Sequence, residues 1–126
     1  MAKLFQLRPM LWVDDVRATI DWYVHNLDFE EGSFVEGWQW GIVTKDEVMI
    51  MFAKPNEHTP YNGPVFTGSL YINTDDVDSL WQKLQHTPYI YYGLDNFEYG
   101  MREFAIKDCN GYILQFGQDL LHEEDH

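Results

Sequence analysis

The residue types that most often perform chemistry are sparse in this sequence and far apart. One histidine falls late in an expected helix, two precede HTP turns and two lie in the C-terminal tail, which favours scattered surface residues. These histidines are His25, His58, His86, His122 and His126. The single cysteine cannot form an internal disulfide or a two-cysteine metal or redox site. No serine stands in the GxSxG context of an activated nucleophile. Nucleophilic catalysis is therefore not supported.

Aromatic and acidic side chains are the unusual feature. The chain has 5 Trp, 8 Tyr and 8 Phe, many in runs such as WQW and YIYYG that cannot all enter a small core, so some line a groove or an interface. With 21 acidic against 8 basic residues the formal charge is -13, which repels nucleic acid and anionic membranes and attracts cations. An acidic surface that serves only solubility is the alternative interpretation.

The elements that must position these residues begin with a strand predicted over residues 4–13. Its alternation places Arg8, Met10 and Trp12 on one face, which is therefore not ordinary core. Asp14 or Asp15 then caps a helix whose apolar spacing ends near residues 26–28. The helix is expected to pack on the opposite strand face, formed by Leu7, Leu11 and Val13.

The order of elements then repeats. Three strands follow the helix at 29–36, 38–44 and 48–53, and the second half has a strand at 69–73, a helix at 77–85 and strands at 89–92, 102–106 and 112–116. VDDV at 13–16 matches TDDV at 74–77 with an offset of 61, and TKDEVMIMF at 44–52 resembles IKDCNGYILQF at 106–116 with an offset that reaches 64. The sequence therefore predicts one domain over 1–126, with modules at about 4–54 and 66–118 and an acidic tail at 119–126.

The stretch GMREFAIKDCNGYILQFG, with MLWVDDVRATIDWY and TGSLYINTDDVDSLW, resembles the vicinal oxygen chelate superfamily of glyoxalases, extradiol dioxygenases and bleomycin-resistance proteins. The resemblance covers nearly the whole chain. It implies an α+β fold in which two tandem βαβββ modules form a curled, half-open barrel sheet with helices outside. It also implies a ligand groove that is often shared between the two subunits of a homodimer.

In the metalloenzymes of this family each module supplies one metal ligand from its first strand and one from its last. The resemblance places these positions at Arg8, Met51, Ser69 and Gln115, and the offsets of 61 and 64 agree with that placement. A guanidinium, a thioether and a hydroxyl are poor donors for a divalent ion, and only Gln115 offers an oxygen. We therefore expect no metal and no cofactor.

The groove is expected to bind a small molecule through aromatic stacking and few polar anchors. The predicted ligand-binding residues are Arg8, Trp12, Trp38, Trp40, Met51, Ser69, Tyr71, Tyr99, Glu103 and Gln115. Each tryptophan could equally close the core or a dimer seam. Arg8, at a half-buried strand position, needs a partner, which could be Glu103, Asp95, the tail or an anionic ligand group.

The function predicted first is a metal-free binding protein of the bleomycin-resistance type, which holds a cationic or aromatic ligand between two subunits without changing it. The alternative is a metal-independent lyase or isomerase in which Arg8 polarises a carbonyl and Glu103 acts as base. A metal-dependent enzyme would need at least three competent ligands, and a protein-binding accessory domain would need a large exposed aromatic patch. The N-terminus has no secretory signal, so a soluble cytoplasmic protein is expected.

Overall fold

The computed structural model describes residues 2–55 and 61–120 and separates the chain into two compact units, Met1–Gly63 and Pro64–His126. The division falls in the Pro- and Gly-bearing connection, so each unit corresponds to one predicted module. The single domain over 1–126 stays a prediction. His58, His122, His126 and the acidic tail from residue 121 lie outside the described residues.

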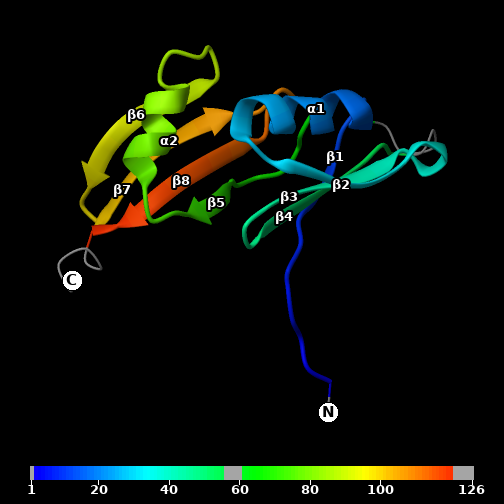
Figure 1. Ribbon diagram of the computed structural model, residues 1–126, viewed down its shortest axis with the longest axis horizontal. Helices are drawn as coiled ribbons and strands as arrows, with labels where there is room; N and C mark the ends of the chain where they lie inside the picture. Colours follow the sequence, from blue (N-terminus) through cyan, green and yellow to red (C-terminus); the bar gives the residue numbers. More distant parts are fainter. Residues whose placement is uncertain (1, 56–60, 121–126) are drawn as a thin grey trace. The chain divides into compact units, whose positions relative to one another are not determined.

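The first module is a four-stranded sheet in the order β1-β4-β3-β2 with one helix across it (Figure 1). Strands β1 and β4 are parallel, and the other pairs are antiparallel. The elements are β1 (Met10–Trp12), α1 (Val16–Leu27), β2 (Glu30–Val35), the 3-10 turn η1 (Glu36–Trp38), β3 (Trp40–Lys45) and β4 (Val48–Ala53). The predicted helix and the three strands that follow it are confirmed.

Helix α1 forms because its capping and its apolar spacing agree. The Asp15 carboxylate accepts a hydrogen bond from the Ala18 backbone N–H, and Asp28 ends the helix in the left-handed conformation. Tyr23 lies on the buried face, with its ring centroid 4.9 Å from that of Phe52. A Cβ at Gly41 would lie 2.5 Å from Ile20 Cδ1, so glycine allows the helix to approach β3 closely.

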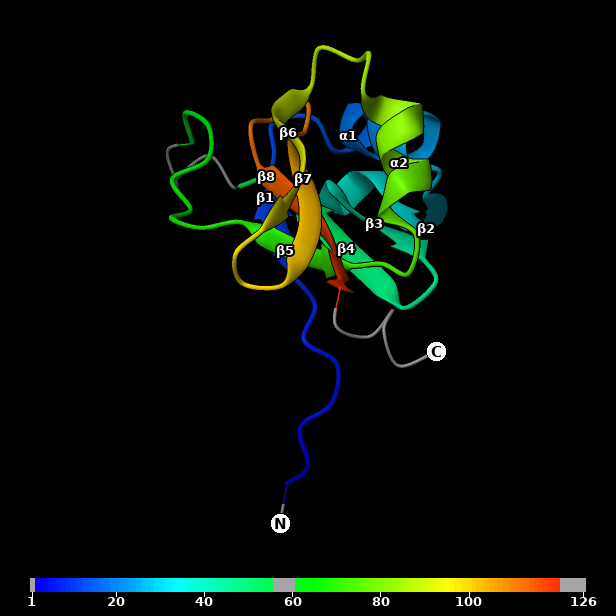
Figure 2. The same ribbon diagram turned by 90° about the vertical axis from the view of Figure 1, so that its left-hand side faces the viewer.

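The second module repeats this plan. Its elements are β5 (Leu70–Asn73), α2 (Val77–Leu84), β6 (Ile90–Phe97), β7 (Met101–Lys107) and β8 (Ile113–Asp119), in the sheet order β5-β8-β7-β6. Figure 2 shows α2 on one side of the strands, where Trp81 packs edge-on against Phe104 of β7. In the turn between β7 and β8, the buried Asp108 accepts backbone hydrogen bonds from Asn110 and Tyr112. This aspartate of the stretch GMREFAIKDCNGYILQFG therefore holds the tight turn between the two strands.

Strand register confirms the internal repeat. Met10 pairs with Met51 in the first module, and Tyr71 pairs with Gln115 in the second. These pairs differ by 61 residues on the first strand and 64 on the last, the offsets read from the sequence. By the same register, Trp40, which pairs with Ala53, corresponds to Glu103, which pairs with Gly117. Equivalent backbone positions thus carry very different side chains.

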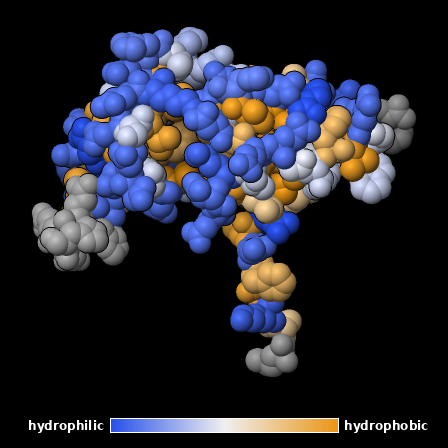
Figure 3. Space-filling view, in the orientation of Figure 1, coloured by the Kyte–Doolittle hydropathy of each residue, from blue (hydrophilic) through white to orange (hydrophobic). Residues whose placement is uncertain are grey.

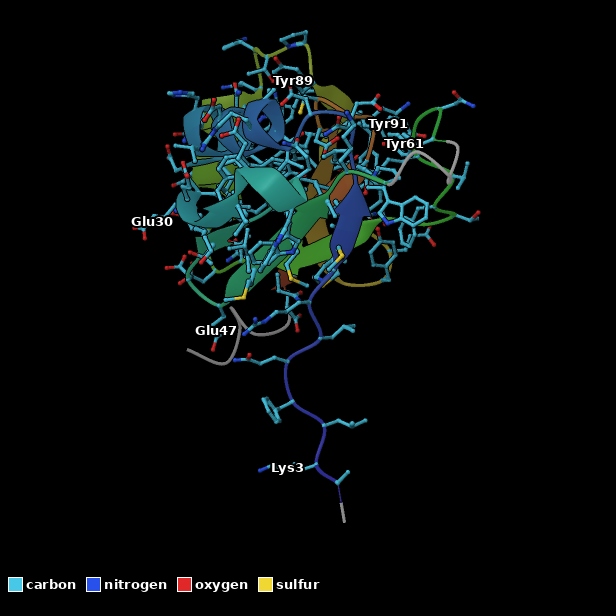
Figure 4. All side chains as sticks on the ribbon, turned by 90° about the vertical axis from the view of Figure 1, so that its right-hand side faces the viewer. Lys3, Glu30, Glu47, Tyr61, Tyr89 and Tyr91 are labelled. Carbon is cyan, nitrogen blue, oxygen red and sulfur yellow. The ribbon has the colours of Figure 1, made fainter. Side chains whose placement is uncertain are left out.

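The N-terminal strand is shorter than predicted. Only Met10–Trp12 pairs with β4, and Leu7, expected in the core beside Leu11, is 98 % exposed. Pro9 is the reason that the ladder ends, because its carbonyl accepts from Met51 N–H but its ring nitrogen has no hydrogen to donate. The preceding segment, with Lys3 near its end, extends away from β1 and carries apolar side chains along it (Figures 3 and 4). Over the residues described, no helix has the length and apolarity needed to cross a membrane.

Candidate functional site

The buried carboxylate of Glu103 is the centre of the candidate site. Glu103 lies on β7 and is fully buried. Its neighbour Phe104 contacts Trp81 of α2, and successive strand residues face opposite sides of a sheet. Glu103 therefore faces away from α2, on the sheet side that no helix of its own module covers. A buried charge is unfavourable unless hydrogen bonds compensate it.

Four donors from the same module surround this carboxylate. Tyr71 Oη of β5 lies 2.9 Å from Glu103 Oε1, and Tyr99 Oη, from the turn after β6, lies 2.7 Å from the same oxygen. Tyr92 Oη of β6 donates to Oε2, and Gln115 Nε2 of β8 lies 3.1 Å from Oε2. Each carboxylate oxygen thus accepts two hydrogen bonds, which fills its ordinary acceptor capacity.

An outer layer of hydrogen bonds holds these donors. Gln115 Nε2 also donates to Tyr92 Oη at 2.8 Å, and Gln115 Oε1 accepts from the Ser69 hydroxyl. The directions are fixed, because an ionised carboxylate can only accept, so the amide NH2 must face it and the amide oxygen must face Ser69. We call Ser69, Tyr71, Tyr92, Tyr99, Glu103 and Gln115 the tyrosine–glutamate cluster.

The cluster keeps its glutamate ionised and its phenols neutral. Burial raises the pKa of Glu103, but the hydrogen bonds from Tyr92, Tyr99, Tyr71 and Gln115 together outweigh it, so the pKa lies below its ordinary value of 4.5. The tyrosine pKa values move the other way. The pKa of Tyr71 is raised mainly by burial and then by its hydrogen bond to Glu103. The pKa of Tyr99 is raised to about 12, mainly by its own hydrogen bond to Glu103 and then by burial. At neutral pH the cluster therefore carries one negative charge.

Tyr71 reaches Glu103 only because position 117 is a glycine. A Cβ at Gly117 would lie 2.0 Å from Tyr71 Oη and 2.6 Å from its Cζ, distances that no real structure tolerates. Gly117 pairs with Glu103 on one side and Asn73 on the other. The missing side chain thus leaves the space through which the phenol approaches the carboxylate.

The structure brings together all five predicted site residues of the second module, namely Ser69, Tyr71, Tyr99, Glu103 and Gln115. Sequence reasoning missed Tyr92, although it stands in the aromatic run YIYYG. The register of β6 against β7 shifts on both sides of Tyr92, so simple alternation along this strand could not show which face it occupies. The ligand-binding role of these residues stays a prediction.

The predicted site residues of the first module differ from these in their exposure. Trp38 is 76 % exposed in η1, and Trp12 is exposed on β1. Trp40 and Met51 are half-buried. The interpretation of Arg8 as a half-buried charge is wrong: it precedes β1, is exposed, and donates to Gln6 Oε1 at 2.7 Å. Because Arg8 is in water, it needs no charged partner.

The donor set of the cluster does not fit a divalent metal. Ser69 and Gln115 stand at the positions where the resemblance places metal ligands, but the Gln115 oxygen already accepts from Ser69 and its NH2 faces the carboxylate. Both Glu103 oxygens are occupied by donors. Within residues 2–55 and 61–120, no three His, Cys, Asp or Glu side chains gather in a way that could hold an ion. The oxygen atoms that a divalent ion would need are therefore already engaged in hydrogen bonds within the cluster.

Solved structures with similar architecture include binding proteins and an enzyme. The bleomycin-binding protein of Streptomyces verticillus, crystallised with copper(II)-bleomycin, is 21% identical with a TM-score of 0.69 over 92% of this chain and 97% of its own. TnmS3, an antibiotic-binding protein from Streptomyces sp. CB03234, is 22% identical with a TM-score of 0.75 over 94% and 98%. Lactoylglutathione lyase of Agrobacterium tumefaciens is 19% identical with a TM-score of 0.72 over 96% and 98%. At these identities the likeness establishes the fold alone.

Comparison with curated protein sequences finds no match. The family model described as Glyoxalase/Bleomycin resistance protein/Dioxygenase superfamily matches residues 6–116, which is most of the chain. The two βαβββ modules and the mixed four-stranded sheets agree with that fold, so the predicted α+β class is confirmed. The chain belongs to the Glyoxalase/Bleomycin resistance protein/Dioxygenase superfamily.

Proposed function

We propose that this protein binds a small molecule without a metal and releases it unchanged, in the manner of an antibiotic-sequestering protein. The observation that carries the proposal is the complete engagement of the Glu103 carboxylate by four donors of its own module. Such a network is rigid and already satisfied, so it can serve as a preorganised platform. Similar solved structures named as bleomycin-binding and antibiotic-binding proteins agree with this function.

Aromatic rings beside the cluster supply the stacking surface. Tyr99 is 63 % exposed and stacks on Phe97, with ring centroids 5.6 Å apart and planes 13° from parallel. Tyr71 is 40 % exposed. Planar rings of a ligand gain both apolar burial and offset stacking on such side chains. The cluster would therefore orient a ligand through its polar edge, and the rings would hold its planar part.

The alternative of a metal-independent lyase or isomerase requires Glu103 to take a proton from the substrate. Its two oxygens already accept two hydrogen bonds each, and its pKa is lowered, in spite of burial, by the hydrogen bonds it accepts. A good general base has a free lone pair and a pKa near the working pH. Glu103 meets neither condition, so binding is the better-supported function.

A second part of the proposal concerns the association of two copies of the chain. Met10 and Trp12 of β1 are exposed, as are Leu4, Phe5 and Leu7 in the segment before it. Exposed apolar side chains of this kind are typical of an interaction surface. We propose that two copies of the chain associate and share their ligand groove, in the cytoplasm. Analytical ultracentrifugation with and without ligand tests the association, and a monomer at all concentrations would contradict it.

The decisive experiment combines metal analysis, calorimetric titration with metal-free bleomycin, and mass spectrometry of the recovered drug. We expect no stoichiometric metal, saturable binding, and a drug of unchanged mass. Tight stoichiometric metal, or conversion of the ligand that is lost in Glu103→Gln at unchanged stability, would overturn the proposal. A parallel titration with planar aromatic compounds lacking bleomycin's sugar and peptide parts shows whether the drug itself or only its aromatic portion is recognised.

A further inference from the structure

Every hydroxyl hydrogen of the tyrosine–glutamate cluster is already used inside it. The three phenol hydrogens point at Glu103, and the Ser69 hydrogen points at Gln115 Oε1. Gln115 Nε2 lies within hydrogen-bond distance of both Glu103 Oε2 and Tyr92 Oη, and these two oxygens are so close together that they share one amide hydrogen. A hydroxyl has one hydrogen, so the cluster has no hydroxyl donor left for a ligand.

Acceptor capacity does remain, on residues that are partly exposed. The hydroxyl oxygens of Tyr71, Tyr99 and Ser69 each donate one hydrogen bond and keep lone pairs to accept others. Tyr71 and Tyr99 are also the exposed members of the cluster. Because each phenol donates to a carboxylate, its oxygen becomes a stronger acceptor through hydrogen-bond cooperativity.

The charge of the cluster is uncompensated in its own surroundings. Among residues 61–120, which the structure describes for this module, the groups that hydrogen-bond to Glu103 are all uncharged. The neighbouring cation Arg102 is held elsewhere, by Asp78 at 2.9 Å and by Asn96. A buried negative charge with neutral partners attracts a cation that approaches the face.

We propose that this face selects a ligand group that is both positively charged and rich in N–H donors: an ammonium, guanidinium or amidinium group. The inference rests on the proposed function, since it names the group held at the same site. The cation would donate to the Tyr71, Tyr99 and Ser69 oxygens while Glu103 beneath them supplies the charge. A carboxylate or phosphate finds no free hydroxyl donor and meets a like charge, and a quaternary ammonium has no N–H to donate and is left with cation–π contacts.

Four probes that share one phenyl ring separate these cases: benzylammonium, benzyltrimethylammonium, benzyl alcohol and benzoate. Binding is followed by amide chemical shifts of the second module, with bleomycin as a separate titration. We expect benzylammonium to bind at least about tenfold more tightly than the quaternary and neutral probes, the factor for roughly one charge-assisted hydrogen bond. Benzoate is expected to bind most weakly.

Variants assign the preference to the cluster. Tyr99→Phe keeps the ring but removes one acceptor, and should weaken benzylammonium binding by several-fold to tenfold. Tyr91→Phe is the matched control, because Tyr91 lies on β6, is similarly exposed, and contacts Lys107 through its ring and not through its hydroxyl. It should change nothing. Glu103→Gln should abolish the preference for the cation over benzyl alcohol, and a thermal melt shows whether that variant is folded.

The outcomes separate the two proposals. Equal binding of all four probes, or tighter binding of benzoate, overturns the inference and leaves a binding protein in place. Bleomycin binding that Tyr99→Phe leaves unchanged, with no shift caused by the four probes, also overturns the inference alone. Failure of bleomycin and of every probe to bind overturns both. A benzylammonium preference lost in Tyr99→Phe and kept in Tyr91→Phe supports both.

Discussion

Gly117→Ala should destabilise the protein because of one side chain, Tyr71. The added Cβ would lie 2.0 Å from Tyr71 Oη, 2.6 Å from Cζ and 2.9 Å from Cε1, so the phenol must leave its place beside Glu103. Loss of a hydrogen bond to a charged group costs about 1.5–3 kcal/mol. Alanine in a strand is more favourable than glycine by about 0.5–1 kcal/mol, which offsets part of this. The expected net loss is about 1–2 kcal/mol.

The same substitution should change sign when Tyr71 is absent. In a Tyr71→Ala background no phenol occupies the space, and Gly117 does not have the positive φ that would strain an alanine. Only the favourable backbone term then remains, so Gly117→Ala should stabilise that variant by about 0.5 kcal/mol. The coupling energy between the two positions is therefore expected at roughly 1.5–3 kcal/mol.

Urea unfolding followed by tryptophan fluorescence measures the free energy of unfolding of the four proteins in this double-mutant cycle: the unchanged protein, Gly117→Ala, Tyr71→Ala and the double variant. Gly93→Ala is the control in the same module, since a Cβ there would meet only Trp81 Cη2 at an ordinary 3.6 Å. We expect that control to be neutral or slightly stabilising. If Gly117→Ala costs as much stability without Tyr71 as with it, another part of the sheet is responsible, and the reasoning about this close approach is refuted.

Three further predictions follow from the capping and the charges. The pKa of Glu103 in the folded protein lies below its ordinary value of 4.5. The ionised carboxylate therefore stabilises the folded protein fully above pH 4.5, and this contribution is lost as the pH falls through the folded pKa. Glu103→Gln should accordingly flatten the acid side of a plot of stability against pH. Tyr92 and Tyr99 have pKa values raised to about 12, so an alkaline absorbance titration should show late phenols, and stability should fall as pH rises from 10 towards 12. Asp15→Ala removes the acceptor for Ala18 N–H and should cost about 1 kcal/mol in urea unfolding, whereas an unchanged midpoint would show that solvent replaces the cap.

The sequence predicted the modular fold because its local signals agree with its long-range ones. The Asp15 cap and the apolar spacing of 16–27 mark α1, and the offsets of 61 and 64 reappear as the parallel pairings of β1 with β4 and β5 with β8. The error over residues 4–9 has an equally local cause. Alternation predicts which residues suit a strand but does not supply a partner, and Pro9 ends the available ladder.

The membership of the candidate site was predicted only in part, since Tyr92 was missed and the five predicted residues of the first module lie outside the cluster, and its geometry was not predicted. Pseudo-symmetry and family resemblance pointed to Ser69 and Gln115, and alternation pointed to Tyr71. That Glu103 would be buried and satisfied by phenols could not be read from a chain with 21 acidic residues, most of which serve an acidic surface. Glu30 and Glu47, for example, point outward from the first module (Figure 4). Burial of one carboxylate depends on the register of three strands and on shifts within β6.

Comparison of the two modules shows why the cluster must act as a unit. At the equivalent positions the first module has Met10 for Tyr71, Trp40 for Glu103, Met51 for Gln115 and Ala53 for Gly117. If Gly117 were an alanine, as at the equivalent position of the first module, the Tyr71 phenol would clash with it. If Tyr71 and Gln115 were methionines, the buried Glu103 would lose two of its hydrogen-bond donors, at a cost of several kcal/mol. The glycine, the phenols and the carboxylate are thus mutually dependent. Replacing one second-module residue by its first-module counterpart should therefore lower the free energy of unfolding by more than the contacts of that residue alone suggest. Two such replacements made together should lower it by less than the sum of the two single replacements.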